Sequence, residues 1–165
     1  PVFLYVGRLA AEKNLAAFLD LHLPGVKRVV GDGPQRAALQ AAYPQVEFVG
    51  YLQGPALASA YQQASVLVFP SRTDTYGLVM LEALACGTPV AAFAVPGPLD
   101  VLEAGVTGVM ADDLRQACLD ALGLDRQRCA ERAAQYSWHA CALEFLAHQP
   151  LLNGSLVNSD RLAVS

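Results

Sequence analysis

Short apolar runs alternate with longer amphipathic segments along most of the chain. Six runs have the length and apolar character of β-strands, and they span 2–6, 26–30, 46–49, 65–69, 89–93 and 108–111. The segments between and after them predict helices over 14–21, 34–42, 55–64, 77–86, 99–104 and 114–122. This alternation predicts an α/β fold with a doubly wound parallel sheet of about six strands. The first, fourth and fifth runs are almost continuously apolar, which is typical of central strands covered on both faces.

The C-terminal part has a different pattern. Two further helices are predicted over 125–136 and 137–148. Residues 151–165 show no clear period, and we expect a frayed tail after a domain that spans 1–150. The chain starts with a strand almost at once and has no initial Met, so we expect it to be one domain of a longer protein.

Composition narrows the class of protein. A hydrophobic fraction of 54% beside a charged fraction of 16% predicts a compact globular body. The formal net charge is −4 and the 11 Lys and Arg residues form no dense block, so no nucleic-acid partner is expected. No apolar run approaches the ~18 residues that a membrane-spanning helix needs. The four cysteines show no CxxC spacing, and we expect free thiols in a reducing, cytoplasmic compartment.

Candidate chemistry lies in the loops after the strands, because ligands bind at the carboxyl ends of the strands in such a sheet. The loop after the first strand reads GRLAAEKN. Its Gly7 permits a tight turn, and Arg8 and Lys13 share the loop with the start of a helix, which suits a diphosphate. The residue types alone fit a solvated loop better, with Lys13 paired to Glu12.

The next two loops carry weaker signals. The sequence GDGPQRA after the second strand begins like the dinucleotide fingerprint GxGxxG, but Arg36 stands where that motif needs its third glycine. This argues against NAD and fits a plain turn. In the loop GYLQGP after the third strand, Gly50 and Gly54 bracket an open segment where a flat base could lie, although a plain connection fits equally well.

The loop after the fourth strand, PSRTDTYGLVM, leads into the helix predicted from residue 77. Glycine there lets a ligand approach the unpaired N–H groups of Gly77, Leu78 and Val79, which would favour an anion. Asp74 precedes these residues on the loop, and Glu82 lies a little over one turn into the helix.

Glu82 poses a problem of its own. The helix is apolar nearly all round, so we expect it to be buried, and an unpaired buried carboxylate costs several kcal/mol. Two partners would solve this: a structural ion pair with Arg8, Lys13 or Arg72, or a pair of sugar hydroxyls such as those of a ribose. The residue types leave both open.

Taken in order, the motifs GRLAAEKN, VVGDGP, FVGYL, FPSRTDTYGLVMLEALACGTPVAA and GVTG resemble the donor-binding C-terminal half of retaining glycosyltransferases of family 4. These are glycogen-synthase-like enzymes with the GT-B fold, and the resemblance covers about residues 2–148. It implies a Rossmann-like domain that forms one half of a GT-B enzyme.

The resemblance also implies roles for individual residues. Arg8 and Lys13 would bind the donor diphosphate, and Asp74 and Glu82 occupy the family's E-x7-E motif. The second acid of that motif usually holds the nucleotide ribose and the first holds hydroxyls of the transferred sugar. Asp in place of Glu at position 74 puts reach and sugar preference in doubt. The four would be catalytic, and the whole donor site would comprise Gly7, Arg8, Lys13, Gly50, Tyr51, Asp74, Tyr76, Gly77, Leu78, Val79 and Glu82.

The implied reaction transfers a sugar from UDP or GDP to an acceptor hydroxyl with retained anomeric configuration. No metal and no cofactor are expected, because cationic side chains would stabilise the leaving diphosphate. The expected partners are the sugar nucleotide, a glycan or lipid-linked acceptor such as an envelope polysaccharide, and a missing N-terminal acceptor domain. The implied location is cytoplasmic, at the inner face of the membrane for the longer protein. Without the N-terminal half we expect little or no turnover.

Three other functions stay open. They are a nicotinamide-dependent oxidoreductase, a sugar-nucleotide epimerase, and a degenerate nucleotide-binding domain without catalysis.

Overall fold

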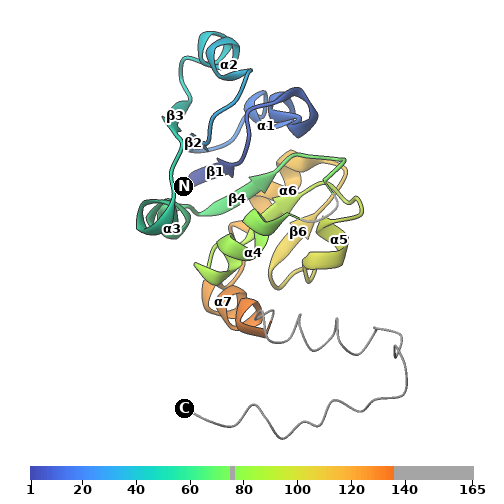
Figure 1. Ribbon diagram of the computed structural model, residues 1–165. Helices are drawn as coiled ribbons and strands as arrows, with labels where there is room; N and C mark the ends of the chain where they lie inside the picture. The colour runs from blue at the N-terminus through green and yellow to red at the C-terminus, as the bar shows by residue number, and fades with distance from the viewer. Residues whose placement is uncertain (75–76, 136–165) are drawn as a thin grey trace, which may run out of the picture. The chain divides into compact units, whose positions relative to one another are not determined.

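The computed structural model describes residues 1–74 and 77–135, which form a six-stranded sheet with helices on both faces (Figure 1). The strands are β1 (Val2–Val6), β2 (Val26–Val30), β3 (Glu47–Gly50), β4 (Val66–Phe69), β5 (Val90–Ala92) and β6 (Gly108–Met110). The α-helices are α1 (Leu15–Leu19), α2 (Arg36–Ala42), α3 (Gly54–Gln63), α4 (Leu78–Ala85), α5 (Pro98–Val101), α6 (Leu114–Ala121) and α7 (Arg126–Gln135). A short 3-10 helix, η1 (Ala11–Lys13), precedes α1.

The sheet is parallel throughout, in the order β3-β2-β1-β4-β5-β6. The chain builds outward from β1 to β3 and then returns to the other side of β1 with β4. This reversal is the switch point of a doubly wound sheet, and it confirms the predicted fold class. β1 and β4 lie at the centre, and every residue of β4 is buried, as its unbroken apolar sequence predicts.

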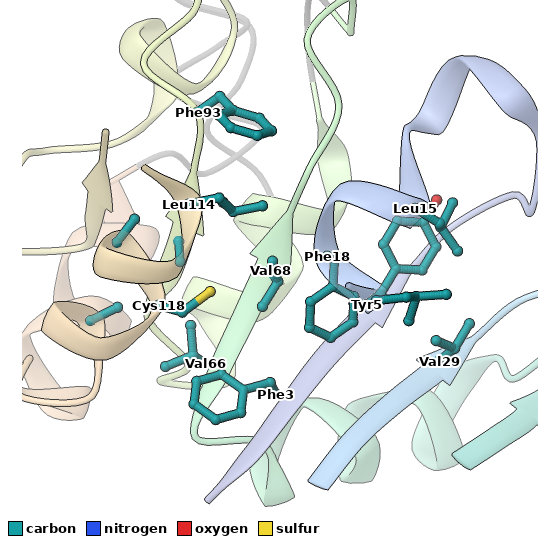
Figure 2. Close-up of a cluster of buried hydrophobic side chains, with 14 of the residues drawn as sticks. Phe3, Tyr5, Leu15, Phe18, Val29, Val66, Val68, Phe93, Leu114 and Cys118 are labelled. Carbon is teal, nitrogen blue, oxygen red and sulfur yellow. The ribbon is translucent and has the colours of Figure 1, made fainter. Parts of the chain in front are cut away.

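Successive side chains of each strand alternate between two hydrophobic clusters, one on each face of the sheet. Phe3 and Tyr5 contribute to the first cluster, which α1 and α6 cover, and Figure 2 shows Phe18 and Leu114 of these helices beside the strand residues. Leu4 contributes to the second cluster, which α3, α4, α5 and α7 cover. The core therefore lies in two layers around the central strands.

The predicted boundaries are accurate to within about two residues for most elements. Pro55 lies in the first turn of α3 as expected, and Gly87 follows α4 in the left-handed region with φ +70°. The predicted helix over 34–42 starts later, because Pro34 lies in a turn and α2 begins at Arg36. The predicted helix over 14–21 is shorter, because Asn14 takes φ +55° and separates η1 from α1. The helix and tail predicted after residue 136 lie outside the described residues.

The expectation that α4 is buried all round is wrong. Met80, Ala83 and Leu84 are fully buried, whereas Leu78 and Glu82 are exposed. One side of this helix packs in the second cluster, and the opposite side is exposed although it also carries apolar residues. Glu82 therefore does not bear the desolvation cost of a buried charge.

Among residues 1–74 and 77–135, no helix is long and apolar enough to cross a membrane. Cys86, Cys118 and Cys129 are free thiols, as predicted, and Cys141 lies outside the described part of the chain. Burial raises the pKa of Cys118 to about 12, with a smaller contribution from Asp113. Such a thiol stays protonated at neutral pH and is a packing group.

Candidate functional site

A cleft runs along the carboxyl ends of β1, β2, β3 and β4, beside the switch point of the sheet. It consists of two adjoining hollows of about 530 Å³ and about 410 Å³, which share Val6, Gly7, Arg8 and Val79. We call the larger, which reaches toward β2 and β3, the first hollow, and the smaller, which reaches toward the loop after β4, the second hollow. Their position agrees with the general placement of ligands on such sheets.

Glu82 lines the first hollow and has a partner that the sequence did not suggest. The Tyr61 hydroxyl, from α3, donates a hydrogen bond of 2.8 Å to Glu82 Oε2. The Tyr61 side chain is 1% exposed, and the pKa of its hydroxyl is raised well above the ordinary value by burial and by the hydrogen bond to Glu82. The structural ion pairs considered for Glu82 are absent among the described residues. Its second oxygen, Oε1, accepts no hydrogen bond from them.

Asp74 and Lys13 form the main polar contact of the second hollow. Lys13 Nζ lies 2.7 Å from Asp74 Oδ1 and 2.9 Å from Oδ2, and each side chain is about a quarter exposed. The pair joins η1 to the loop after β4, and the Asn14 side chain donates to Pro70 O at 3.1 Å in the same place. The alternative in which Lys13 pairs with Glu12 is therefore wrong.

Arg8 lies between the two hollows and lines both. Its side chain is exposed, and its guanidinium contacts no partner in the described part of the chain. The Tyr5 hydroxyl donates to the backbone oxygen of Arg8 at 2.9 Å and thereby fixes the loop. Burial raises the pKa of Tyr5 above its ordinary value, with smaller contributions from the charges of Asp74 and Glu12. The Arg8 guanidinium is thus available to a ligand, while the backbone of the residue is held by the Tyr5 hydroxyl.

The loops after β1 and β2 pack closely enough to require glycine. A side chain at Gly31 would place its Cβ 1.9 Å from Gly7 O, and φ at Gly31 is +137°. A Cβ at Gly7 would meet the Tyr5 hydroxyl at 2.8 Å. The floor of the cleft is therefore bare backbone, which a flat or charged ligand can approach closely.

The N-terminus of α4 opens into the second hollow. Gly77, Leu78 and Val79 line it, and a Cβ at Gly77 would lie 2.9 Å from the Phe69 ring. The first N–H groups of an α-helix have no intrahelical partner, so those of Leu78 and Val79 are able to bind an anion. Tyr76, also predicted for the site, lies outside the described residues.

The structure thus brings most of the predicted residues to one cleft. Tyr51 is 70% exposed and lines the first hollow. Gly50 does not line either hollow; its carbonyl accepts from Gly31 N at 2.8 Å and helps to shape the floor. Further residues line the first hollow and were not predicted: Gly31, Asp32, Leu52, Gln53 and Leu57. Their position after the second and third strands is the signal in the sequence that indicates them, although the GDGP segment on its own fits a plain turn.

No three His, Cys, Asp or Glu side chains gather as metal ligands would in residues 1–74 and 77–135. The cleft offers an anion three sources of positive potential instead: Arg8, Lys13 and the start of α4. It also offers carboxylates to hydroxyl groups: Asp32 and Glu82 line the first hollow, and Glu12 and Asp74 line the second. An elongated ligand with an anionic middle and hydroxyl-bearing ends fits this arrangement.

The chain is similar to known proteins in both sequence and structure. The family model described as glycosyl transferases group 1 matches residues 1–123. A GDP-mannose-dependent alpha-mannosyltransferase of Mycobacterium tuberculosis is 35% identical over 165 residues, covering 93% of this chain and 44% of the relative. One of the same description from Mycolicibacterium smegmatis is 41% identical over 118 residues, covering 68% of this chain and 30% of the relative. The chain thus spans less than half the length of these relatives.

Solved structures show the same fold. Sucrose-phosphate synthase from Thermosynechococcus elongatus superposes with a TM-score of 0.73 at 32% identity, over 89% of this chain and 44% of that one. The apo form of the lipopolysaccharide outer core galactosyltransferase WaaB also gives a TM-score of 0.73, at 20% identity, over 88% of this chain and 47% of that one.

Proposed function

Because the chain belongs to the family of group 1 glycosyl transferases, we propose that its cleft binds the nucleoside diphosphate sugar of a retaining glycosyl transfer. The observation that carries the proposal is the gathering of Arg8, Lys13, Asp74, Glu82 and the start of α4 in one cleft. The nucleoside occupies the first hollow, the diphosphate lies near Arg8, and the sugar occupies the second hollow.

The first hollow suits a nucleoside. Glu82 can accept hydrogen bonds from both hydroxyls of a ribose, because a carboxylate has two oxygens and about four lone-pair sites. The bare backbone near Gly31 and the exposed ring of Tyr51 offer flat surfaces to a base. The role of Glu82 is thus to fix the ribose.

The second hollow suits a diphosphate and a sugar. As the bond between the anomeric carbon and the phosphate oxygen breaks, its electron pair passes to the diphosphate, and Arg8, Lys13 and the N–H groups of Leu78 and Val79 stabilise that charge. The acceptor hydroxyl then forms the new bond to the anomeric carbon and passes its proton to the leaving diphosphate. Catalysis by this domain is therefore mainly stabilisation of the leaving group.

The Lys13–Asp74 pair gives this site a particular property. In the free protein, Asp74 satisfies the ammonium group of Lys13 at 2.7 Å. A bound diphosphate competes for the same ammonium group, and the released Asp74 carboxylate can accept hydrogen bonds from sugar hydroxyls. Asp74 thus exchanges one partner for another when the full donor binds.

GDP-mannose is the first donor to test, because both mannosyltransferases compared above are described as GDP-mannose-dependent. The chain spans 44% of the first of them, so acceptor binding and turnover are assigned to a longer protein with an additional N-terminal domain. The acceptor is a hydroxyl of a glycan or glycolipid. We expect the 165-residue chain to bind the donor without appreciable transfer.

A calorimetric titration of the chain with GDP, UDP, ADP and GDP-mannose tests the proposal. We expect saturable binding of one nucleotide, weakened roughly 10-fold or more by Arg8→Ala and by Glu82→Ala. Arg28→Ala is a matched control, because Arg28 pairs with Glu47 at 2.8 Å and lines neither hollow. Equal weakening by all three variants, or tight binding of NAD in place of these nucleotides, would refute the assignment.

A non-catalytic nucleotide-binding domain is the second candidate, and Asp74 in place of the family's usual Glu is the observation that favours it. The two candidates differ in transfer by the longer protein. Nucleotide binding without any transfer to an acceptor would favour the second.

A further inference from the structure

The carboxylate of Glu82 is held by a single contact from the protein interior. Among the described residues, the Tyr61 hydroxyl is the one hydrogen-bond partner of this side chain, at 2.8 Å. Tyr61 is 1% exposed and comes from α3, whereas Glu82 is exposed and comes from α4. A buried donor thus reaches through the second hydrophobic cluster to the edge of the cleft.

The backbone of Tyr61 is itself fixed from behind. The hydroxyl of Thr88 donates to Tyr61 O at 2.6 Å, and Thr88 is fully buried. Arg126, the first residue of α7, donates to Gln62 O at 2.9 Å and to Ala64 O at 2.5 Å. These contacts clamp the C-terminal end of α3, so the Tyr61 ring has a defined position.

A fixed hydroxyl donor orients a flexible carboxylate. A glutamate side chain has several rotatable bonds, and ordering it in a complex has an entropic cost. The bond from Tyr61 is made to Oε2, whereas Oε1 has no hydrogen-bond partner among the described residues, and Glu82 lines the first hollow. Because burial and the hydrogen bond raise the pKa of Tyr61, its hydroxyl stays protonated and remains a donor at working pH.

We infer that Tyr61 is a positioning residue that pre-orients Glu82 for the ribose hydroxyls of the donor. This inference rests on the proposed function, since it takes the ribose as the ligand of Glu82. Tyr61 does not touch the nucleotide; it acts only through Glu82. Its hydroxyl therefore matters for nucleotides that have ribose hydroxyls and for no others.

The test compares the affinity for a ribonucleotide with the affinity for its dideoxy counterpart, which lacks the ribose hydroxyls. Affinities for GDP and 2′,3′-dideoxy-GDP, and for the corresponding uridine pair, are measured by calorimetry on wild-type chain, Tyr61→Phe, Glu82→Ala and the double variant. We expect Tyr61→Phe to weaken the ribonucleotide roughly 10-fold and the dideoxynucleotide less than about twofold. In the double variant, Tyr61→Phe should have no further effect, because its target carboxylate is gone.

A second tyrosine–carboxylate pair supplies a matched control. Tyr43 donates to Asp20 Oδ1 at 2.7 Å, and neither residue lines the cleft. Tyr43→Phe should leave both affinities unchanged. Tyr61→Phe keeps the buried ring, and thermal unfolding of each variant shows whether the fold is intact.

The outcomes separate this inference from the function on which it rests. Equal loss for both nucleotides, or no loss, would show that Tyr61 does not act through the ribose contact, and would overturn the inference alone. A wild-type chain that binds both nucleotides equally, with no effect of Glu82→Ala, would remove the ribose role of Glu82, and the inference would fall with it. Absence of any nucleotide binding would refute the proposed function itself.

Discussion

A buried tyrosine is associated with each hollow, because Tyr61 contacts Glu82 from behind the first hollow and Tyr5 lines the second, but the two hydroxyls have different partners. In the first hollow, the Tyr61 hydroxyl donates directly to Glu82. In the second hollow, the Tyr5 hydroxyl donates to the backbone oxygen of Arg8, and the carboxylate of Asp74 is held by Lys13 instead. One acid is therefore held by a neutral donor and the other by a cation.

This difference has a consequence for ligand binding. A neutral donor from the core does not compete for an anionic ligand, so the contact to Glu82 can persist when the cleft fills. A lysine ammonium group attracts phosphate as well as carboxylate, so the contact to Asp74 can open. The comparison indicates a fixed acid at the nucleoside end of the cleft and an exchangeable acid at the sugar end.

The largest expected effect comes from breaking the exchangeable pair. Lys13→Ala removes a cation and leaves the charge of Asp74 facing the diphosphate, so we expect binding of GDP or UDP to weaken about 100-fold. Adding Asp74→Asn to Lys13→Ala should raise the affinity again by about 10-fold, because the carboxylate that repels the diphosphate is gone. Titration calorimetry on the single and double variants measures both. A double variant no better than Lys13→Ala would show that Asp74 does not act on the diphosphate.

The fixed acid should respond differently to salt. Glu82→Ala should weaken ribonucleotide binding roughly 10-fold, by loss of hydrogen bonds to the ribose hydroxyls. The contact of Glu82 joins a charge to neutral hydroxyls, so the fold-loss of affinity caused by Glu82→Ala should change little between low and high salt. The fold-loss caused by Lys13→Ala should shrink at high salt, because salt screens the attraction between two charges. Titrations at two NaCl concentrations compare the two fold-losses. The same salt dependence for both variants would remove the distinction between the two ends.

Asp74→Asn alone should have a smaller effect, and its size should differ between the bare nucleotide and the sugar nucleotide. Loss of the carboxylate frees Lys13, so bare GDP or UDP should bind about threefold tighter. The sugar nucleotide should gain less, because its hydroxyls lose a charged acceptor. The measurement is the ratio of the two affinities in wild-type and variant chains. Weaker binding of the bare nucleotide would contradict an exchangeable pair.

The smallest expected effect concerns the tyrosines. The folded chain keeps the buried hydroxyls of Tyr5 and Tyr61 protonated, with pKa values raised by burial, whereas the unfolded chain releases these protons near pH 10. Their contribution to stability is therefore fully present below pH 10 and is lost as the pH rises above it. Ionisation of each tyrosine in the unfolded chain should lower the free energy of unfolding by about 0.4 kcal/mol at pH 10, relative to neutral pH.

Denaturant unfolding of Tyr5→Phe and Tyr61→Phe checks this value. Each variant should lose less stability than wild type between pH 8 and pH 10, and the buried thiols contribute equally to all three proteins. An identical alkaline loss in wild type and in both variants would mean that these hydroxyls do not resist ionisation in the fold.

The sequence predicted the sheet well because local patterns determine strands. Residues of β4 are apolar without exception, and burial on both faces explains that pattern directly. The cleft was also predictable, since ligand-binding loops follow the carboxyl ends of parallel strands. Gly7 and Arg8 were identified in this way.

The contacts inside the cleft were not predictable from local patterns. Tyr61 and Glu82 meet because α3 and α4 pack side by side, and Lys13 and Asp74 are 61 residues apart. One sequence carries no signal for such pairs. The apolar composition of α4 also suggested complete burial, but the cleft itself leaves part of that helix uncovered, and Glu82 is exposed there.

A crystal structure of the chain with bound GDP-mannose is the most direct test of the proposed donor site. We expect Glu82 Oε1 within hydrogen-bond distance of a ribose hydroxyl, with the Tyr61–Glu82 bond retained, and Lys13 turned from Asp74 to the diphosphate. A structure in which Lys13 still holds Asp74 and the ribose lies away from Glu82 would contradict it.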